Sequence, residues 1–320
     1  MKGKHKIEVR NNKIVFKLEL ERSITVIKGD SATGKTTLVE LLGYYQNFGA
    51  SSGVTVKCDK PCIVLSGSSW KLTIANTKDS IVFIDEGENY VATEEFASII
   101  KDSDNYYVII TRENLYNLPI SVDAIYGMKG RRYFQLKKTY NHLYRIYPQT
   151  QSKASEFSRW IVEDSNSGYQ FFSAVAEEKG IECLSAGGNG KLLMLVKALS
   201  NEPQLLIADG ASFGAYMEMA DRYYRERQVH LFLPESFEWL ILKSGLIDGN
   251  EVREILENPS GYIESSEYFS WERFFTALLV EKSKSTYLEY SKKKLNPAYL
   301  QEHEKTEILN QTPLGEQTGD

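Results

Sequence analysis

The stretch from Gly29 to Thr36 constrains the fold of this chain more than any other. It reads Gly-Asp-Ser-Ala-Thr-Gly-Lys-Thr and fits the pattern G-x-x-x-x-G-K-[ST] without a mismatch. An apolar run at 24–27 precedes it, and leucines at helical spacing follow Lys35. A strand, a glycine-rich loop and a helix in this order gather backbone N–H groups around one phosphate group. The motif therefore predicts a phosphate-binding loop at the edge of a parallel α/β sheet.

Each residue type in this loop has an expected task. The glycines permit backbone conformations that other residues resist, so that successive N–H groups point into one concavity. Lys35 is expected to reach the β and γ phosphates, and the hydroxyl of Thr36 to ligate Mg²⁺. The predicted cofactors are therefore ATP and Mg²⁺. The residues expected around the phosphates are Gly29, Asp30, Ser31, Ala32, Thr33, Gly34, Lys35, Thr36 and Thr37.

Short apolar runs at 62–65, 81–84 and 107–110 predict further strands, of which the second ends in Asp85-Glu86 and the third in Thr111-Arg112. Ligands of parallel sheets bind at the carboxyl ends of the strands. We therefore expect Asp85 to hold Mg²⁺ and Glu86 to orient or deprotonate an attacking water. Thr111 is a candidate sensor of the γ-phosphate. Arg112 is a candidate catalytic residue, in cis or across an interface, although an exposed arginine after a strand has the same pattern.

These residues resemble the P-loop ATPases that carry an Asp-Glu pair, a group that includes the ABC-type, SMC-like and AAA-type enzymes. The alternating pattern of the opening hairpin, followed by Ile-Lys-Gly-Asp-Ser-Ala-Thr-Gly-Lys-Thr-Thr-Leu, is most similar to the ABC and SMC start. The interval from Lys35 to Asp85 leaves no room for the helical subdomain with the ABC signature. Leu65-Ser66-Gly67 is a fragment of that signature on another element. The resemblance implies an ATP hydrolase but no standard ABC sandwich dimer, and another homo-oligomer stays open.

The second half repeats the α/β rhythm and places carboxylates at strand ends. A strand pattern at 159–162 leads to Glu163 and Asp164, a glycine-rich turn follows at 187–190, and a second strand pattern leads to Asp209-Gly210-Ala211. This order resembles the Toprim fold of topoisomerases, primases and the OLD-family nucleases, in which a Toprim domain follows an ABC-like ATPase.

The Toprim resemblance implies a glutamate for proton transfer and an Asp-x-Asp pair for Mg²⁺. Glu163 matches the catalytic glutamate and Asp209 the first metal ligand, but the second ligand position falls on Ala211. Asp164 or Glu238 is a candidate replacement for the lost carboxylate. The same residues also fit structural tasks, because an aspartate can end a strand and a glutamate can cap a helix.

The length and the linker pattern predict two domains. A chain of 320 residues is long enough for about two, and a polar segment at 148–155 separates the halves. We expect an α/β fold: a P-loop parallel sheet with an N-terminal β-hairpin, then a second α/β domain with a helical C-terminal extension. The predicted ranges are 1–150 for the ATPase domain, 155–245 for the Toprim-like domain, 246–308 for the extension and 309–320 for a flexible tail.

The charge of the chain restricts how it can meet a polyanion. The formal net charge is −5, so any contact with nucleic acid must come from a local patch. Two stretches mix cations with aromatic rings, as phosphate contacts and base stacking require. A solvated surface has the same composition, and a protein partner is equally open. The first patch comprises Arg131, Arg132, Lys137 and Lys138 with Tyr133, Phe134 and Tyr140; the second comprises Lys282, Lys284, Lys292, Lys293 and Lys294 with Tyr287 and Tyr290.

Composition also bounds the cellular setting. Three cysteines without framework spacing favour a reducing compartment, and no apolar run is long enough to cross a bilayer. The N-terminal residues lack the apolar run of a signal peptide. These features predict a cytoplasmic protein without membrane contact.

Two functions from different classes fit these patterns. The first is a Mg-ATP-dependent ATPase coupled to a Toprim-like domain that acts on or binds nucleic acid or a partner protein, which the OLD-like comparison links to DNA processing or defence against mobile elements. The alternative is a nucleotide-gated binding or scaffold protein with negligible turnover and no nuclease activity.

Overall fold

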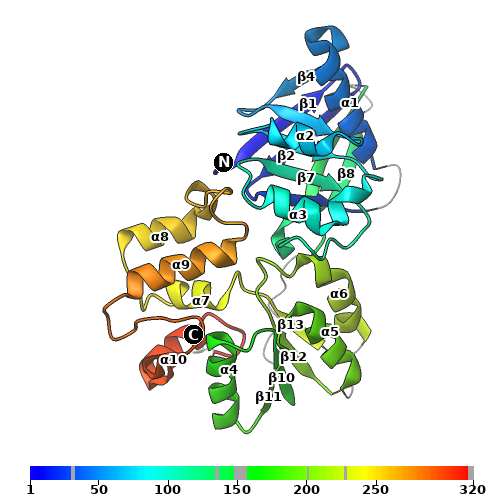
Figure 1. Ribbon diagram of the computed structural model, residues 1–320. Coiled ribbons are helices and arrows are strands. Elements are labelled where there is room, and N and C mark those ends of the chain that lie inside the picture. The colour runs from blue at the N-terminus through cyan, green and yellow to red at the C-terminus, as the bar shows by residue number, and fades with distance from the viewer. Residues whose placement is uncertain (30–32, 134–136, 148–156, 200–201, 227–228, 316–320) are drawn as a thin grey trace. The chain divides into compact units, whose positions relative to one another are not determined.

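The computed structural model describes residues 1–29, 33–133, 137–147, 157–199, 202–226 and 229–315 (Figure 1). The chain forms two compact units. The first unit comprises Met1–Pro148 and Asn258–Ser270, and the second comprises Gln149–Glu257 and Trp271–Asp320. The linker expected at 148–155 lies outside the described residues. None of the helices in the described part of the chain has the length and apolar character of a membrane span.

The first unit is built on a mixed sheet of nine strands in the order β4-β1-β2-β9-β8-β3-β7-β6-β5. Its core strands β3, β7, β6 and β5 are parallel, whereas β1 with β2 and β8 with β9 form antiparallel pairs. The strands are β1 (His5–Arg10), β2 (Ile14–Leu20), β3 (Ile24–Ile27), β4 (Thr55–Lys57), β5 (Cys62–Leu65), β6 (Ile81–Ile84), β7 (Tyr106–Ile110), β8 (Ile125–Tyr133) and β9 (Lys138–Arg145).

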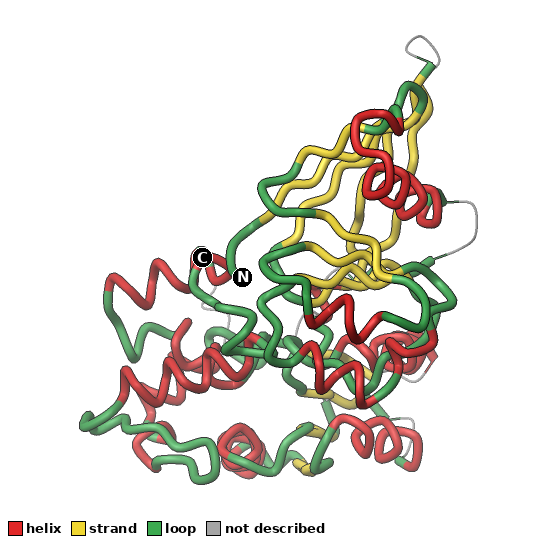
Figure 2. Tube along the Cα trace, turned by 45° about the horizontal axis from the view of Figure 1, so that its top comes forward, coloured by secondary structure: helices red, strands yellow, loops and turns green. Residues whose placement is uncertain are grey.

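Helix α1 (Lys35–Phe48) is the centre of the first unit's core. It contacts β4 and β5, although these strands stand at opposite ends of the sheet order, so the sheet curves around the helix (Figure 2). Leu38, Leu41 and Leu42 are buried in one cluster with Phe16 and Val108. Each such side chain contributes about 1.5–3 kcal/mol when fully buried. The remaining helices are η1 (Gly49–Ser52), α2 (Trp70–Ala75), η2 (Asn89–Ala92), α3 (Glu94–Ile100), η3 (Val122–Ala124) and, in the returning segment, η5 (Pro259–Gly261).

The second unit is built on a parallel sheet of four strands in the order β11-β10-β12-β13. Its strands are β10 (Arg159–Val162), β11 (Glu182–Ser185), β12 (Gln204–Ile207) and β13 (Val229–Phe232). Its helices are α4 (Ser167–Glu178), α5 (Asn189–Ala198), η4 (Gly214–Tyr216), α6 (Met217–Glu226), α7 (Phe237–Lys243), α8 (Asn250–Glu257), α9 (Trp271–Ser283), η6 (Pro297–Leu300) and α10 (Glu302–Leu309). After α10 the turns at 310–315 are described, whereas the end of the expected tail, 316–320, lies outside the described residues.

The predicted α/β class and the N-terminal β-hairpin are confirmed. The runs predicted as strands at 24–27, 62–65, 81–84 and 159–162 coincide with β3, β5, β6 and β10. Between α1 and β6 the longest helix is α2, with six residues, so the described chain there contains no helical subdomain. The hairpin of β8 and β9 was not predicted.

The backbone after β13 lies very close to Gly210, which follows β12, and a substitution at Gly210 tests this contact. A Cβ atom at this position would lie 2.5 Å from the carbonyl oxygen of Leu233 and 2.9 Å from that of Pro234. We expect Gly210→Ala to lower the free energy of unfolding by about 1–3 kcal/mol, because the backbone must shift. Urea denaturation followed by circular dichroism measures the change. Gly249→Ala is the control, since nothing lies within 4 Å of its added Cβ; equal midpoints for both variants would contradict the predicted clash.

Candidate functional site

Three parallel strands of the first unit end side by side in polar residues. Ile27 of β3 aligns with Ile110 of β7, and Ile109 of β7 aligns with Ile84 of β6. The glycine-rich loop, Thr111-Arg112 and Asp85-Glu86 therefore leave the sheet at the same edge. The structure thus brings together the residues that the sequence singled out for a nucleotide site.

The described part of the glycine-rich loop leads directly into α1. Gly34 has a φ of 92°, in the left-handed region that favours glycine, and directly precedes α1. Lys35 is 6% exposed, and its Nζ donates to the carbonyl oxygen of Gly29 at 2.8 Å and to Oγ1 of Thr33 at 3.1 Å. Thr36 is exposed on the first turn of α1. Asp30, Ser31 and Ala32 lie outside the described residues.

An ion pair joins the polar residues that follow β6 to those that follow β7. Nε of Arg112 lies 2.7 Å from Oε1 of Glu86, in an ion pair whose side chains are 60% and 38% exposed. Oδ1 of Asp85 accepts a hydrogen bond from the backbone N–H of Glu86 at 2.8 Å. Thr111 is buried, and its Oγ1 accepts from the N–H of Glu113 at 3.0 Å. Glu86 and Arg112 thus carry opposite charges that partly neutralise each other at this edge of the sheet, a pairing that the sequence did not indicate.

In the second unit, the two predicted carboxylates follow neighbouring parallel strands. Val162 of β10 aligns with Ile207 of β12, so Glu163 and Asp209 leave the sheet at the same edge. A cavity of about 20 Å³ lies against Glu163, Asp164 and Asp209. This volume is enough for one water-sized occupant.

Residues from the C-terminal part of the chain complete this site. Glu238, at 2% exposed, accepts a hydrogen bond from Oη of Tyr290 at 2.8 Å. Nζ of Lys292 lies 2.5 Å from Oε1 of Glu272 and 3.7 Å from Oε1 of Glu238. We call Glu163, Asp209, Glu238 and Glu272 with Lys292 the carboxylate cluster.

The second predicted basic-aromatic patch is an open surface only in part, because Tyr290 is buried and Lys282 and Lys292 are half-buried, whereas Lys284, Tyr287, Lys293 and Lys294 are exposed. Lys292 and Tyr290 belong to the carboxylate cluster, and Oη of Tyr290 also lies 2.5 Å from Oγ of Ser167. Lys282 pairs with Glu251 at 2.6 Å, and Tyr287 donates to Glu304 at 2.9 Å. These side chains pair with carboxylates from other elements, of which Glu238 is buried and Glu251 is 63% exposed.

Burial and mutual repulsion shift the protonation of the cluster. Burial, followed by the charges of Glu272 and Asp164, raises the pKa of Glu163 to about 7. Burial, Glu272 and Glu238 raise the pKa of Asp209 well above its usual range. Burial alone would lower the pKa of Lys292, but Glu238, Glu272 and Asp209 outweigh it and raise that pKa. Four carboxyl groups around one ammonium group leave an excess of negative charge that a proton or a further cation can neutralise.

The two candidate replacements for the lost aspartate differ in their contacts. Oδ1 of Asp164 accepts from the backbone N–H of Tyr169 at 2.9 Å and so caps the start of α4, whereas Glu238 reaches the cluster. Among the residues that the structure describes, no three Asp, Glu, His or Cys side chains are grouped to hold a metal ion as they stand. The oxygen donors of the cluster are nevertheless of the kind that Mg²⁺ takes, as are Thr36 and Asp85 in the first unit.

Comparison with known proteins adds no identification. No protein-family model matches the chain, and no significant match is found among curated proteins.

Lys292 provides a test of the cluster's electrostatics. We expect Lys292→Met to lower the free energy of unfolding by about 2–3 kcal/mol, because Glu238 would stay buried without its cationic neighbour. The value lies below that of a fully enclosed pair, since Lys292 is 33% exposed. Chemical denaturation in a chelator measures the loss. Lys293→Met is the matched control, because this neighbouring side chain is exposed; equal stability of the two variants would contradict the assignment.

Proposed function

We propose that the first unit is a Mg-ATP-dependent ATPase. The observation that carries this proposal is the meeting of the glycine-rich loop, Asp85-Glu86 and Thr111-Arg112 at one edge of the parallel sheet. The left-handed Gly34 and the N-terminus of α1 fit a phosphate group.

The roles of the residues follow from these positions. Lys35 exchanges its contacts with Gly29 and Thr33 for the β and γ phosphates, which present stronger negative charge. Thr36 and Asp85 would hold Mg²⁺, which would supply charge neutralisation on the phosphates when bound. Glu86 orients the attacking water and accepts its proton once Arg112 turns towards the transferred phosphate.

Lys35→Ala tests nucleotide binding. We expect the variant to lose measurable affinity for a fluorescent ATP analogue, because the loop then lacks its one side-chain cation aimed at the phosphates. Lys71→Ala, on exposed α2, is the control and should bind as the wild type does. Tight binding of ATP by Lys35→Ala would overturn the assignment.

Glu86→Gln separates binding from turnover. We expect unchanged ATP affinity and a loss of steady-state phosphate release of about a hundredfold or more, since the amide cannot accept a proton. Glu95→Gln, on the exposed surface of α3, should keep wild-type turnover. If the wild type binds ATP without turnover, with and without DNA, the nucleotide-gated scaffold replaces the ATPase as the proposal.

A second proposal concerns the second unit, for which the excess negative charge of the carboxylate cluster favours metal-dependent hydrolysis of nucleic-acid phosphodiesters. Asp209 with Glu238 or Glu272 would hold the cation, and Glu163 would move the proton, as the Toprim resemblance implies. Mg²⁺ supplies polarisation of the phosphate when bound.

Cleavage assays test the second proposal. We expect wild-type protein with Mg²⁺ or Mn²⁺ to cut plasmid DNA or RNA, and Glu163→Ala to abolish cleavage. Glu177→Ala, exposed on α4, is the control. Including and omitting ATP shows whether the first unit gates the reaction. Equal lanes for wild type and Glu163→Ala would end the nuclease proposal and leave a binding role.

A further inference from the structure

The sheet of the first unit has an outer face, opposite the one that covers α1. Along β1 and β2, the side chains of Ile7, Val9, Phe16 and Leu18 are buried in the core with α1, while the alternate residues point outward. The strand register extends this outer face over five strands. It includes Lys57 of β4; Lys6, Glu8 and Arg10 of β1; Val15, which is buried, with Lys17 and Glu19 of β2; Lys138, Tyr140, His142 and Tyr144 of β9; and Lys129, Arg131 and Tyr133 of β8.

Cations dominate this face although the chain as a whole is acidic. The carboxylates on its described strands, Glu8 and Glu19, lie at the β1 and β2 side, where Lys17 is 3.9 Å from Glu8 and Lys6 is 3.7 Å from Glu19. The described residues that β8 and β9 contribute include no acid. On this face the described parts of β8 and β9 therefore carry cations without carboxylates beside them.

Aromatic rings stand among these cations. Tyr140, His142 and Tyr144 alternate along β9, so the rings repeat every ~6.7 Å, about twice the ~3.4 Å separation of stacked bases. Tyr133 meets Tyr140 edge to face with ring centroids 5.3 Å apart, and the guanidinium of Arg131 lies 5.3 Å from the Tyr133 ring centroid. Tyr133 and Tyr144 are 41% and 48% exposed, so these rings are not packed into the core.

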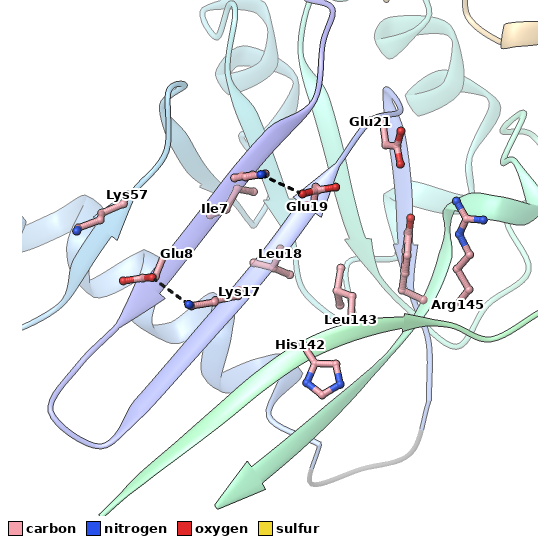
Figure 3. A pocket seen from close by; sticks show the side chains of 12 residues that line it. Ile7, Glu8, Lys17, Leu18, Glu19, Glu21, Lys57, His142, Leu143 and Arg145 are labelled. Atoms are coloured by element: carbon pink, nitrogen blue, oxygen red, sulfur yellow. Dashed lines mark ion pairs between the residues drawn. The ribbon is translucent and has the colours of Figure 1, made fainter. Parts of the chain in front are cut away.

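A hollow opens on the same sheet beside these residues. β2 and β9 pair only as far as Lys17 and His142 and then separate, as Figure 3 shows. The hollow has a volume of about 660 Å³, and its lining includes Lys57, Arg145 and the apolar side chain of Leu143. It is of the size that a small-molecule group such as a nucleotide base and sugar fills.

We infer that the outer face binds a single-stranded polynucleotide. The lysines and arginines would neutralise its phosphates, and the exposed rings would stack on its bases. Unpaired strands fit better than a duplex, because bases inside a duplex do not offer their π-faces to a protein. Neither the phosphate loop nor the carboxylate cluster takes part in this inference, so it does not depend on the proposed functions.

Fluorescence anisotropy in the absence of ATP tests whether the outer face binds single strands. The probes are labelled oligo(dT) and oligo(U) of about 20 nucleotides, and a duplex of equal length. We expect both single strands to bind more tightly than the duplex, with affinity falling steeply between ~50 and ~200 mM salt. Comparison of oligo(dU) with oligo(U), which differ only in the 2′-hydroxyl, identifies the preferred sugar.

Neighbouring arginines provide a matched pair of variants. The register places Arg131 on the outer face and Arg132 on the opposite one. Arg131→Ala should weaken binding several-fold and reduce the salt slope by about 0.7, whereas Arg132→Ala should leave both unchanged. Tyr140→Leu should weaken binding about five- to hundredfold without changing the slope. Tyr144→Leu replaces it should Tyr140→Leu lower the melting temperature.

Three results would overturn the inference. The first is the absence of binding at low salt. The second is equal loss in Arg131→Ala and Arg132→Ala, which would place the contact elsewhere. The third is binding of duplex and heparin as tight as that of single strands, with no effect of the tyrosine variants, which would leave only general polyanion attraction.

Discussion

Backbone hydrogen bonds between buried parallel strands decide which polar side chains can meet in this protein. The central strands β3, β6 and β7 of the first unit are buried on both faces, and their register with one another leaves no freedom to slide. The polar residues that follow the strands are therefore delivered to one edge. The same device operates in the second unit, where β10 and β12 deliver Glu163 and Asp209.

The two sites differ in how firmly their charges are held. The Glu86–Arg112 pair is exposed to water, so opening it costs little, and a nucleotide can compete for Arg112. The carboxylate cluster is more deeply buried, with Glu238 2% exposed, and Lys292 lies near several carboxyl groups. Removing the positive charge of Lys292 would lower the free energy of unfolding, since water does not reach a buried carboxylate to replace that charge. The first site is thus suited to rearrangement, and the second to holding a fixed charge distribution.

The sequence alone predicted the elements whose signal is local. Runs of four apolar residues identify β5 and β6, Ile24, Val26 and Ile27 around Thr25 identify β3, and the loop motif marks its own strand and helix. The hairpin of β8 and β9 was missed because one end of β8 is buried and the other exposed, so the pair shows no regular alternation of apolar and polar residues.

The candidate sites were predictable to a different extent. The polar ends of strands follow from the order of residues, and so Asp85, Glu163 and Asp209 could be named in advance. The part played by Glu272 and Lys292 could not, since they come from a stretch more than a hundred residues after Glu163 and carry no motif. The lysine-rich run around Lys292 indicated only positive charge. Such a run does not show which carboxylates the lysines will pair with in the folded protein.

Because the first unit is formed by two separate stretches of the chain, its coding sequence is interrupted by that of the second unit. The backbone passes between the units at 148–149, 257–258 and 270–271. The returning segment is fastened to the first unit by the N–H of Gly3, which donates to the carbonyl oxygen of Ser260 at 2.6 Å, and by Oγ of Ser265, which donates to the carbonyl oxygen of Ser103 at 3.3 Å. Neither unit is therefore encoded by one continuous segment that a single recombination event could exchange. A fragment that ends at residue 148 would lack the 258–270 segment of the first unit.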